Sequence, residues 1–194
     1  MKIIGLIQKY STGKNVAVLF VMNMAAYVTI IFYSIPKVVG AAPAMKLFDV
    51  SPFGYTMAYA ISLLHAIGPE GRHLYLSLQL PLDFIYPGLF IISYSFLFAL
   101  LLKKNYDLES KVYFVLFIPI LAGVFDYAEN ALVIMMLRAY PDLNATLVNS
   151  ASFMTIMKGI LTSIFFVLFS LGCIQILWKS IYRKRWVHLM SNPG

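Results

Sequence analysis

Hydrophobic residues dominate four long stretches of the chain, and few charged positions interrupt them. The hydrocarbon core of a bilayer is about 30 Å thick and takes about 20 residues to cross as a helix. All four stretches reach this length, so the pattern predicts membrane-spanning helices at about residues 16–35, 76–102, 112–137 and 151–178. We therefore predict an all-α integral membrane protein in which residues 1–194 form one four-helix bundle.

A fifth apolar stretch, at about residues 52–67, is too short to cross the bilayer. Its apolar residues recur at helical spacing, Ser51 is a suitable N-cap and Pro52 suits the first turn. Gly68 and Pro69 are expected to end this helix. The pattern predicts a short amphipathic helix on the extracytoplasmic side, which either lies on the membrane surface or partly re-enters over the mouth of the bundle.

Composition and charge agree with a membrane setting. The chain is 61% hydrophobic and 12% charged, whereas soluble domains average about 45–50% apolar and about 25% charged residues. Ten of the 15 basic residues fall on one side of the predicted spans and four on the other, while Lys158 lies inside a span. Such a bias predicts that both termini are cytoplasmic. The basic tail at 179–194 is expected to contact anionic lipid headgroups, so the expected partners are membrane lipids and not nucleic acid.

Polar residues interrupt the third span in the stretch "GVFDYAENALVIMM". Asp126, Glu129 and Asn130 stand at positions i, i+3 and i+4, so they share one helix face. The same face carries Ala122 and Gly123, whose small size lets another helix approach closely. An acid exposed to lipid at mid-membrane costs about 2.5–3.5 kcal/mol. We therefore predict that this face points into the bundle.

The other spans supply candidate partners for these residues. In "LQLPLDFIYPG", Gln79 lies one turn before Asp83, and Tyr86 follows it. Pro87 has no N–H to donate to the backbone carbonyl of Asp83, which is left free at a predicted kink. The fourth span contributes Lys158. At a rise of about 1.5 Å per residue, these residues and the acids of the third span all fall in the outer half of the membrane.

The predicted polar layer holds more acids than one lysine can neutralise, so either some carboxyls stay protonated or a cationic group binds. An arginine at the bundle mouth can hold a phosphate or carboxylate headgroup. The alternative is that the layer only ties helices together, at about 0.6–2 kcal/mol for each polar contact. The candidate ligand-binding residues are Arg72, Gln79, Asp83, Tyr86, Asp126, Glu129, Asn130 and Lys158.

Several kinds of chemistry lack support in the sequence. The lone Cys173 excludes an internal disulfide and a C-x-x-C oxidoreductase. Three scattered histidines give no metal or haem signature, so we expect no metal and no cofactor. Neither G-x-S-x-G nor H-E-x-x-H occurs to support hydrolysis. If the layer is catalytic, Asp126 and Glu129 exchange protons while Lys158 stabilises developing negative charge.

Three motifs together, "GPEGRHLY", "LPLDFIYP" and "VFDYAENALVIMM", resemble those of small, functionally uncharacterised bacterial membrane proteins with about four spans. The resemblance covers mainly residues 68–136. It implies a bacterial inner membrane and brings no known activity with it.

Three functions stay open at this stage. The first is binding or transport of a cationic or amphipathic small molecule, or of a lipid headgroup, at a cavity open to the outside; a homodimer would suit transport by so small a bundle. The second is a membrane enzyme that acts on a lipid-like substrate by carboxylate acid–base chemistry. The third is a structural or assembly subunit. Whether the protein is an enzyme is left undecided by the residues.

Overall fold

The described part of the chain is entirely helical apart from its connecting loops. This computed structural model describes residues 2–40 and 42–191, with side chains up to residue 181 except that of residue 180. The predicted contact of the basic tail with lipid falls mainly on side chains outside this range. Four helical segments are long and apolar enough to cross a membrane: Gly13–Val39, Gly68–Lys103, Lys111–Ala139 and Ala145–Lys179. An all-α, multi-pass membrane protein with four spans is therefore confirmed.

Each span is built from one or more consecutive helical pieces. The first span joins α2 (Gly13–Thr29), a π-helical turn (Ile30–Ser34) and α3 (Ile35–Val39). The second joins α5 (Gly68–Leu74), another π-helical turn (Tyr75–Gln79) and α6 (Leu80–Lys103). The third joins a 3₁₀ turn (Lys111–Leu116) to α7 (Phe117–Ala139), and the fourth is α8 (Ala145–Ser191). Outside the spans lie α1 (Lys2–Tyr10), a 3₁₀ turn (Phe48–Val50) and α4 (Met57–Ala66).

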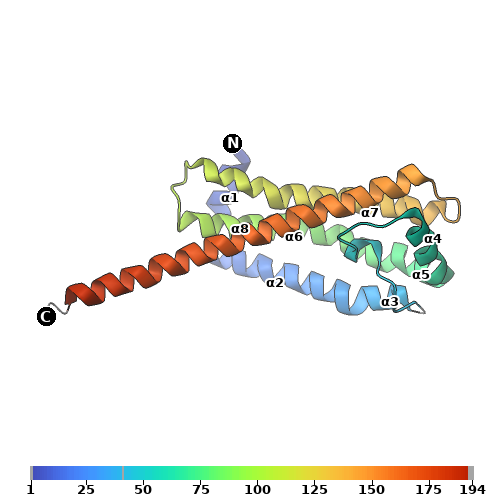
Figure 1. Cartoon of the computed structure of the whole chain (residues 1–194), viewed down its shortest axis with the longest axis horizontal. Helices are drawn as coiled ribbons and strands as arrows, with labels where there is room; N and C mark the ends of the chain where they lie inside the picture. The colour runs from blue at the N-terminus through green and yellow to red at the C-terminus, as the bar shows by residue number, and fades with distance from the viewer. Residues whose placement is uncertain (1, 41, 192–194) are drawn as a thin grey trace.

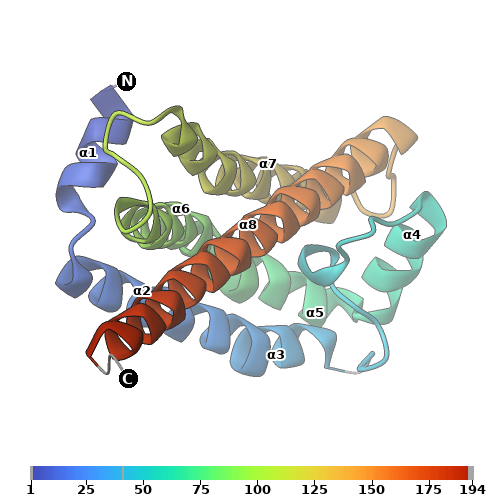
Figure 2. The same ribbon diagram turned by 60° about the vertical axis from the view of Figure 1, so that its left-hand side comes forward.

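The spans form a bundle with α6 at its centre. Helix α6 packs on both α2 and α7, and α7 packs along α8. Both termini lie at one end of the molecule, while α3, α4 and α5 gather at the other (Figure 1). Helix α8 crosses the bundle diagonally, so α2 and α8 diverge toward the end that holds α3 (Figures 1 and 2). We call this end the outer end, because the sequence predicts it to be extracytoplasmic.

The helices of the first two spans extend past their predicted limits, and in both cases the predicted limit had been set near a proline. The first span continues through Pro36 to Val39, and the second begins at Gly68 and passes through Pro81. A proline ring clashes with the carbonyl four residues earlier and donates no hydrogen bond. A π-helical turn precedes each proline, and its wider i→i+5 bonding lets the helix absorb the defect.

The short outer helix is confirmed, although its predicted start is wrong. Helix α4 begins at Met57, and its N-cap is Thr56, whose hydroxyl accepts a hydrogen bond from the Tyr59 N–H. The hydroxyl of Ser51, the predicted N-cap, instead donates to the carbonyl of Leu47, four residues earlier. Gly54 prevents a helix from starting at Pro52, because its φ is 78°. Glycine adopts this backbone region readily.

A helix at the N-terminus was not predicted. Helix α1 buries Ile4 and Ile7 against the inner end of the bundle. Lys103, at the end of α6, donates to the carbonyl of Ser11 at 3.1 Å and to that of Gln8. Lys103 thus joins α1 to the end of α6.

The apolar core is divided into two clusters by a polar layer. The outer cluster includes Leu80 of α6, Val133 of α7 and Ala151 of α8. The inner cluster includes Phe90, Ala122 and Phe165 of the same three helices. On every one of these helices, the predicted polar residues lie between the two clusters. The fold therefore confines the candidate site to one level of the bundle.

Candidate functional site

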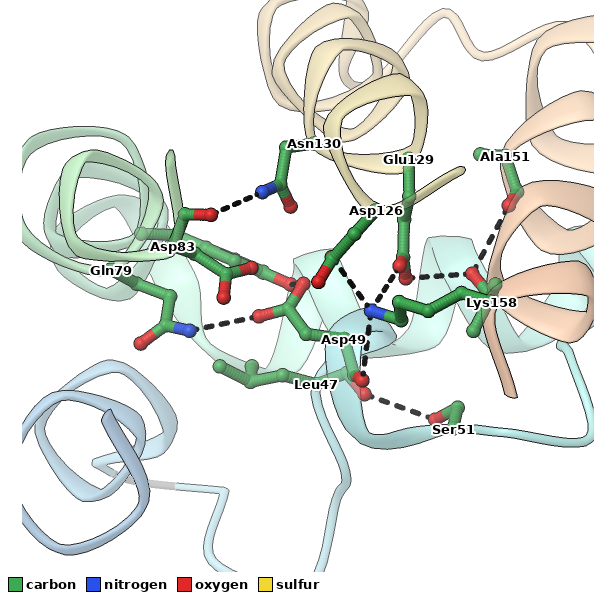
Figure 3. A network of polar contacts seen from close by, with 12 residues as sticks. Leu47, Asp49, Ser51, Gln79, Asp83, Asp126, Glu129, Asn130, Ala151 and Lys158 are labelled. Atoms are coloured by element: carbon green, nitrogen blue, oxygen red, sulfur yellow. Dashed lines mark hydrogen bonds and ion pairs between the residues drawn. The ribbon is translucent and has the colours of Figure 1, made fainter. Parts of the chain in front are cut away.

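Lys158 of α8 is the centre of the polar layer. Its ammonium group forms an ion pair with Asp126 at 3.0 Å and a second, shorter one with Glu129, both from α7 (Figure 3). Lys158 therefore pairs with both acids of α7. The two acids share one face because three residues separate them on a helix, which lets a single lysine reach both.

Glu129 is the least exposed acid of the layer. It is 0% exposed. The Thr155 hydroxyl donates to its Oε1 at 2.7 Å, while Lys158 pairs with its Oε2. Thr155 lies on α8 three residues before Lys158 and also donates to the carbonyl of Ala151. Glu129 thus ties α7 to α8, a structural role, and it leaves Asp126 as the member of the pair that reaches toward open space.

Asp49 enters the layer from the outer loop. The Tyr75 hydroxyl donates to its Oδ1 at 2.8 Å, and the Gln79 amide donates to its Oδ2 at 3.0 Å. Lys158 also approaches the backbone carbonyl of Asp49 at 3.5 Å. Burial raises the pKa of the Asp49 carboxyl above its usual value, and this outweighs the lowering effects of Lys158 and of the two hydrogen bonds.

Asp83 differs from the other acids because no side chain pairs with it. It is 4% exposed, and its Oδ2 has no hydrogen-bond partner within residues 2–40 and 42–181. Figure 3 shows its carboxylate pointing toward those of Asp49 and Asp126. Its backbone carbonyl, which Pro87 leaves free, accepts a 2.7 Å hydrogen bond from the Asn130 amide. As predicted, this carbonyl has no helical N–H donor, and the Asn130 amide donates to it instead.

A cavity of about 360 Å³ lies beside these acids. Asp49, Asp83, Asp126 and Lys158 line its polar side. Its other walls are largely apolar and aromatic, and they include Tyr27 and Ile31 of the first span and Tyr86 and Phe90 of α6. Glu129 and Asn130 are not among the lining residues, since both point into helix interfaces.

The remaining predicted site residues lie in different places. Tyr86 lines the cavity. Gln79 is fully buried and acts by holding Asp49. Arg72 lies at the outer end, where it donates to the carbonyl of Leu64 at 2.6 Å. Its guanidinium also lies 4.5 Å from the centre of the Tyr140 ring. Arg72 therefore secures the end of α4 and does not line the cavity.

Sequence reasoning missed Asp49 entirely. The residue lies in the loop stretch "KLFDVSPF", where a charged residue normally faces water. The sequence held one indication that Asp49 is buried: it is flanked by Leu47, Phe48 and Val50, three apolar residues in a segment too short for a span. Leu47 and Phe48 are 0% exposed and pull the loop into the outer core, which carries Asp49 down to the polar layer.

Comparisons of the sequence with family models, curated proteins and solved structures find no match for this chain. The four-span character suggested by the motif resemblance is supported by the fold, and no family is identified. Chemically, the layer presents four carboxyl groups and one ammonium group around a small cavity. Within the part of the chain that the structure describes, no cluster of three or more His, Cys, Asp or Glu side chains is arranged to hold a metal ion.

Proposed function

We propose that the protein binds a cationic, amphipathic small molecule, whose positive group lies beside Asp83 in the cavity. The supporting observation is the state of Asp83 itself. It is buried, faces the cavity, and has an Oδ2 without a partner among the described residues. Lys158 does not form an ion pair with Asp83, because its ammonium group is shared by Asp126 and Glu129.

A bound cation would remove an energetic penalty. A buried ionised carboxylate without a partner is costly because the low-dielectric interior replaces water poorly. An ammonium group placed between Asp83 and Asp126 would offer charge-assisted hydrogen bonds to both. The rings of Tyr27, Tyr86 and Phe90 in the cavity wall add favourable faces for a cation, as aromatic side chains do within about 6 Å.

A purely structural layer explains less of the site. Glu129, Thr155 and Lys158 form a satisfied interhelical tie, which is what a structural role requires. Asp83 contributes no side-chain contact to such a tie, and Asp49 brings one more acid to a layer already rich in them. Binding is also the step that transport and catalysis on a lipid-like substrate share, so it is the part of the function that this geometry supports.

The charge distribution supports an orientation for the whole molecule. The end that holds both termini carries most of the lysines, so we propose that this end is cytoplasmic and that the cavity lies in the outer half of the membrane. Together with the motif resemblance, this favours a bacterial inner membrane. Reaction of an engineered cysteine at Phe53, which is exposed in the outer loop, with a membrane-impermeant maleimide on intact cells tests the orientation; protection of that cysteine would overturn it.

The binding proposal can be tested with radiolabelled dodecylamine and protein reconstituted into nanodiscs. We expect saturable binding above that of empty nanodiscs. Asp83→Asn should weaken it by about tenfold or more, because a charge-assisted hydrogen bond contributes about 1.5–3 kcal/mol and about 1.4 kcal/mol corresponds to tenfold.

The matched control is Asp142→Asn, which neutralises an exposed acid in the outer loop between α7 and α8. This variant should bind like the wild type. Binding no greater than that of empty nanodiscs, or equal binding by wild type and Asp83→Asn, would overturn the proposal.

A further inference from the structure

The outer loop lines the end of the cavity nearest the outer aqueous phase. Asp49, Val50 and Pro52 of the outer loop form this side of its wall. The loop is held there, because Leu47 and Phe48 are buried in the outer cluster and the Asp49 carboxylate accepts hydrogen bonds from Tyr75 and Gln79 of the π-helical turn before α6. A cavity open to the outside was expected from the sequence. At this end Asp49 and Val50 are half-buried and Pro52 is exposed, so the loop covers the acids only in part.

A second exposed part of the cavity wall lies on its side. Tyr27 of α2 lines the cavity and is 44% exposed, and Ser163 of α8 lines it and is exposed as well. Helices α2 and α8 share no extensive packing and diverge toward the end that holds α3 (Figure 2). Both residues lie within membrane spans. The exposed cavity wall at Tyr27 and Ser163 therefore faces lipid.

The size and chemistry of the cavity limit what can fill it. Its volume of about 360 Å³ is near the lower limit of ligand pockets, which run from about 300 to 1,000 Å³. It can hold a charged head with a short part of a chain. The lining also includes Ile30 and Ile31, which suit hydrocarbon and not a second charge.

We propose that the ligand is a membrane-resident alkylamine that enters sideways from the bilayer between α2 and α8. Its ammonium head lies at Asp83 and Asp126, and its hydrocarbon tail leaves the cavity between Tyr27 and Ser163 into the outer leaflet. This inference rests on the proposed function and narrows it: the ligand partitions from lipid and not from water. Its experiment must therefore report on the position of the tail separately from binding of the head.

Tryptophan fluorescence can locate the tail. Both native tryptophans are first replaced, as Trp178→Phe and Trp186→Phe, and Tyr27→Trp then places a single reporter at the opening while keeping an aromatic wall. The probe is dodecylamine that carries bromine in the middle of its chain, because bromine quenches tryptophan on contact. The matched control is Phe32→Trp in the same background, an aromatic replacement at a residue of the same span that is 75% exposed and does not line the cavity.

We expect fluorescence loss at position 27 that saturates together with radiolabelled dodecylamine binding, and only a shallow, unsaturated loss at position 32. Adding Asp83→Asn should shift the saturable part to amine concentrations about tenfold higher or more. If Asp83-dependent binding persists but quenching at position 27 is no greater than at position 32, the side opening is wrong and the proposed function stands. If no Asp83-dependent binding occurs in nanodiscs, both proposals fall.

Discussion

The side-chain amide of Asn130 donates a 2.7 Å hydrogen bond to the backbone carbonyl of Asp83. Pro87 follows Asp83 by four residues and supplies no helical N–H to that carbonyl. A side chain from α7 thus replaces the donor that α6 lacks. The bond joins the two helices at the level of the acids, and it holds the backbone from which the Asp83 carboxylate reaches the cavity.

Replacing Asn130 by alanine should destabilise the protein by about 1–3 kcal/mol, because a buried carbonyl loses its partner. The loss should be smaller in a Pro87→Ala background, where residue 87 regains an N–H that can donate to the same carbonyl. Thermal or denaturant unfolding in detergent of the two single variants and the double variant measures this coupling.

Asn149→Ala serves as the control for the asparagine replacement, since Asn149 is exposed on α8. It should leave stability nearly unchanged. Equal costs of Asn130→Ala with and without Pro87 would show that the amide does not stand in for the missing backbone donor.

Neutralising different members of the polar layer should have opposite effects. Lys158→Met should cost about 3–5 kcal/mol, because it leaves two buried carboxylates without their cation. Asp83→Asn should leave the melting temperature unchanged or raise it, since it removes an acid that has no cation in the unliganded protein. Melting in detergent without added amine checks both, with exposed Lys104→Met and Asp142→Asn as controls. A sharp loss of stability in Asp83→Asn would make that residue part of the structural tie.

Gly123 should tolerate no side chain. A Cβ there would overlap the Ile91 side chain and lie 3.1 Å from the Pro87 carbonyl oxygen. Overpacking of this kind costs about 1–3 kcal/mol. Gly5→Ala in α1 is the matched replacement, because no heavy atom lies within 4 Å of its Cβ position, and it should stabilise by up to about 1 kcal/mol. Unfolding measurements that rank the two variants in the reverse order would contradict this close approach of α6 and α7.

The stability that depends on Asp49 should fall as pH rises. An aspartate ionises near pH 3.9 in an unfolded chain, and burial raises the pKa of Asp49 in the native state. Between these two values the native state binds more protons than the unfolded state, so its stability is greatest below about pH 4 and declines through the native pKa. Asp49→Asn should remove this decline, which melting temperatures across the acidic range would show.

Asn can be accommodated at position 49. Its carbonyl still accepts from Tyr75, and a half-turn of the Gln79 amide brings Gln79 Oε1, which has no partner among the described residues, toward the new N–H₂ group. Asp142→Asn should leave the pH dependence as in the wild type. Parallel pH curves for wild type and Asp49→Asn would mean that Asp49 has no such role.

Much of the site could be predicted because helical geometry is local. The spacing of Asp126, Glu129 and Asn130 fixes their common face, and Pro87 removes a specific hydrogen bond of Asp83, whatever the rest of the chain does. The convergence with Lys158 followed from depth along the spans. The partner of each group could not be predicted in the same way, since it depends on how the helices are rotated about their axes.

The sequence by itself determined four membrane spans, their approximate limits, the clustering of charge at one end and an inward-facing acidic layer, because hydrophobicity and helical periodicity act over a few turns. Only the tertiary structure decided that Glu129 ties α7 to α8, that Asp83 Oδ2 has no hydrogen-bond partner among the described residues, and that the cavity wall is exposed at Tyr27 and Ser163. It also brought in Asp49, whose position comes from the burial of Leu47 and Phe48 between helices distant in sequence. Such long-range packing leaves no periodic pattern in the chain, so only the folded structure reveals it.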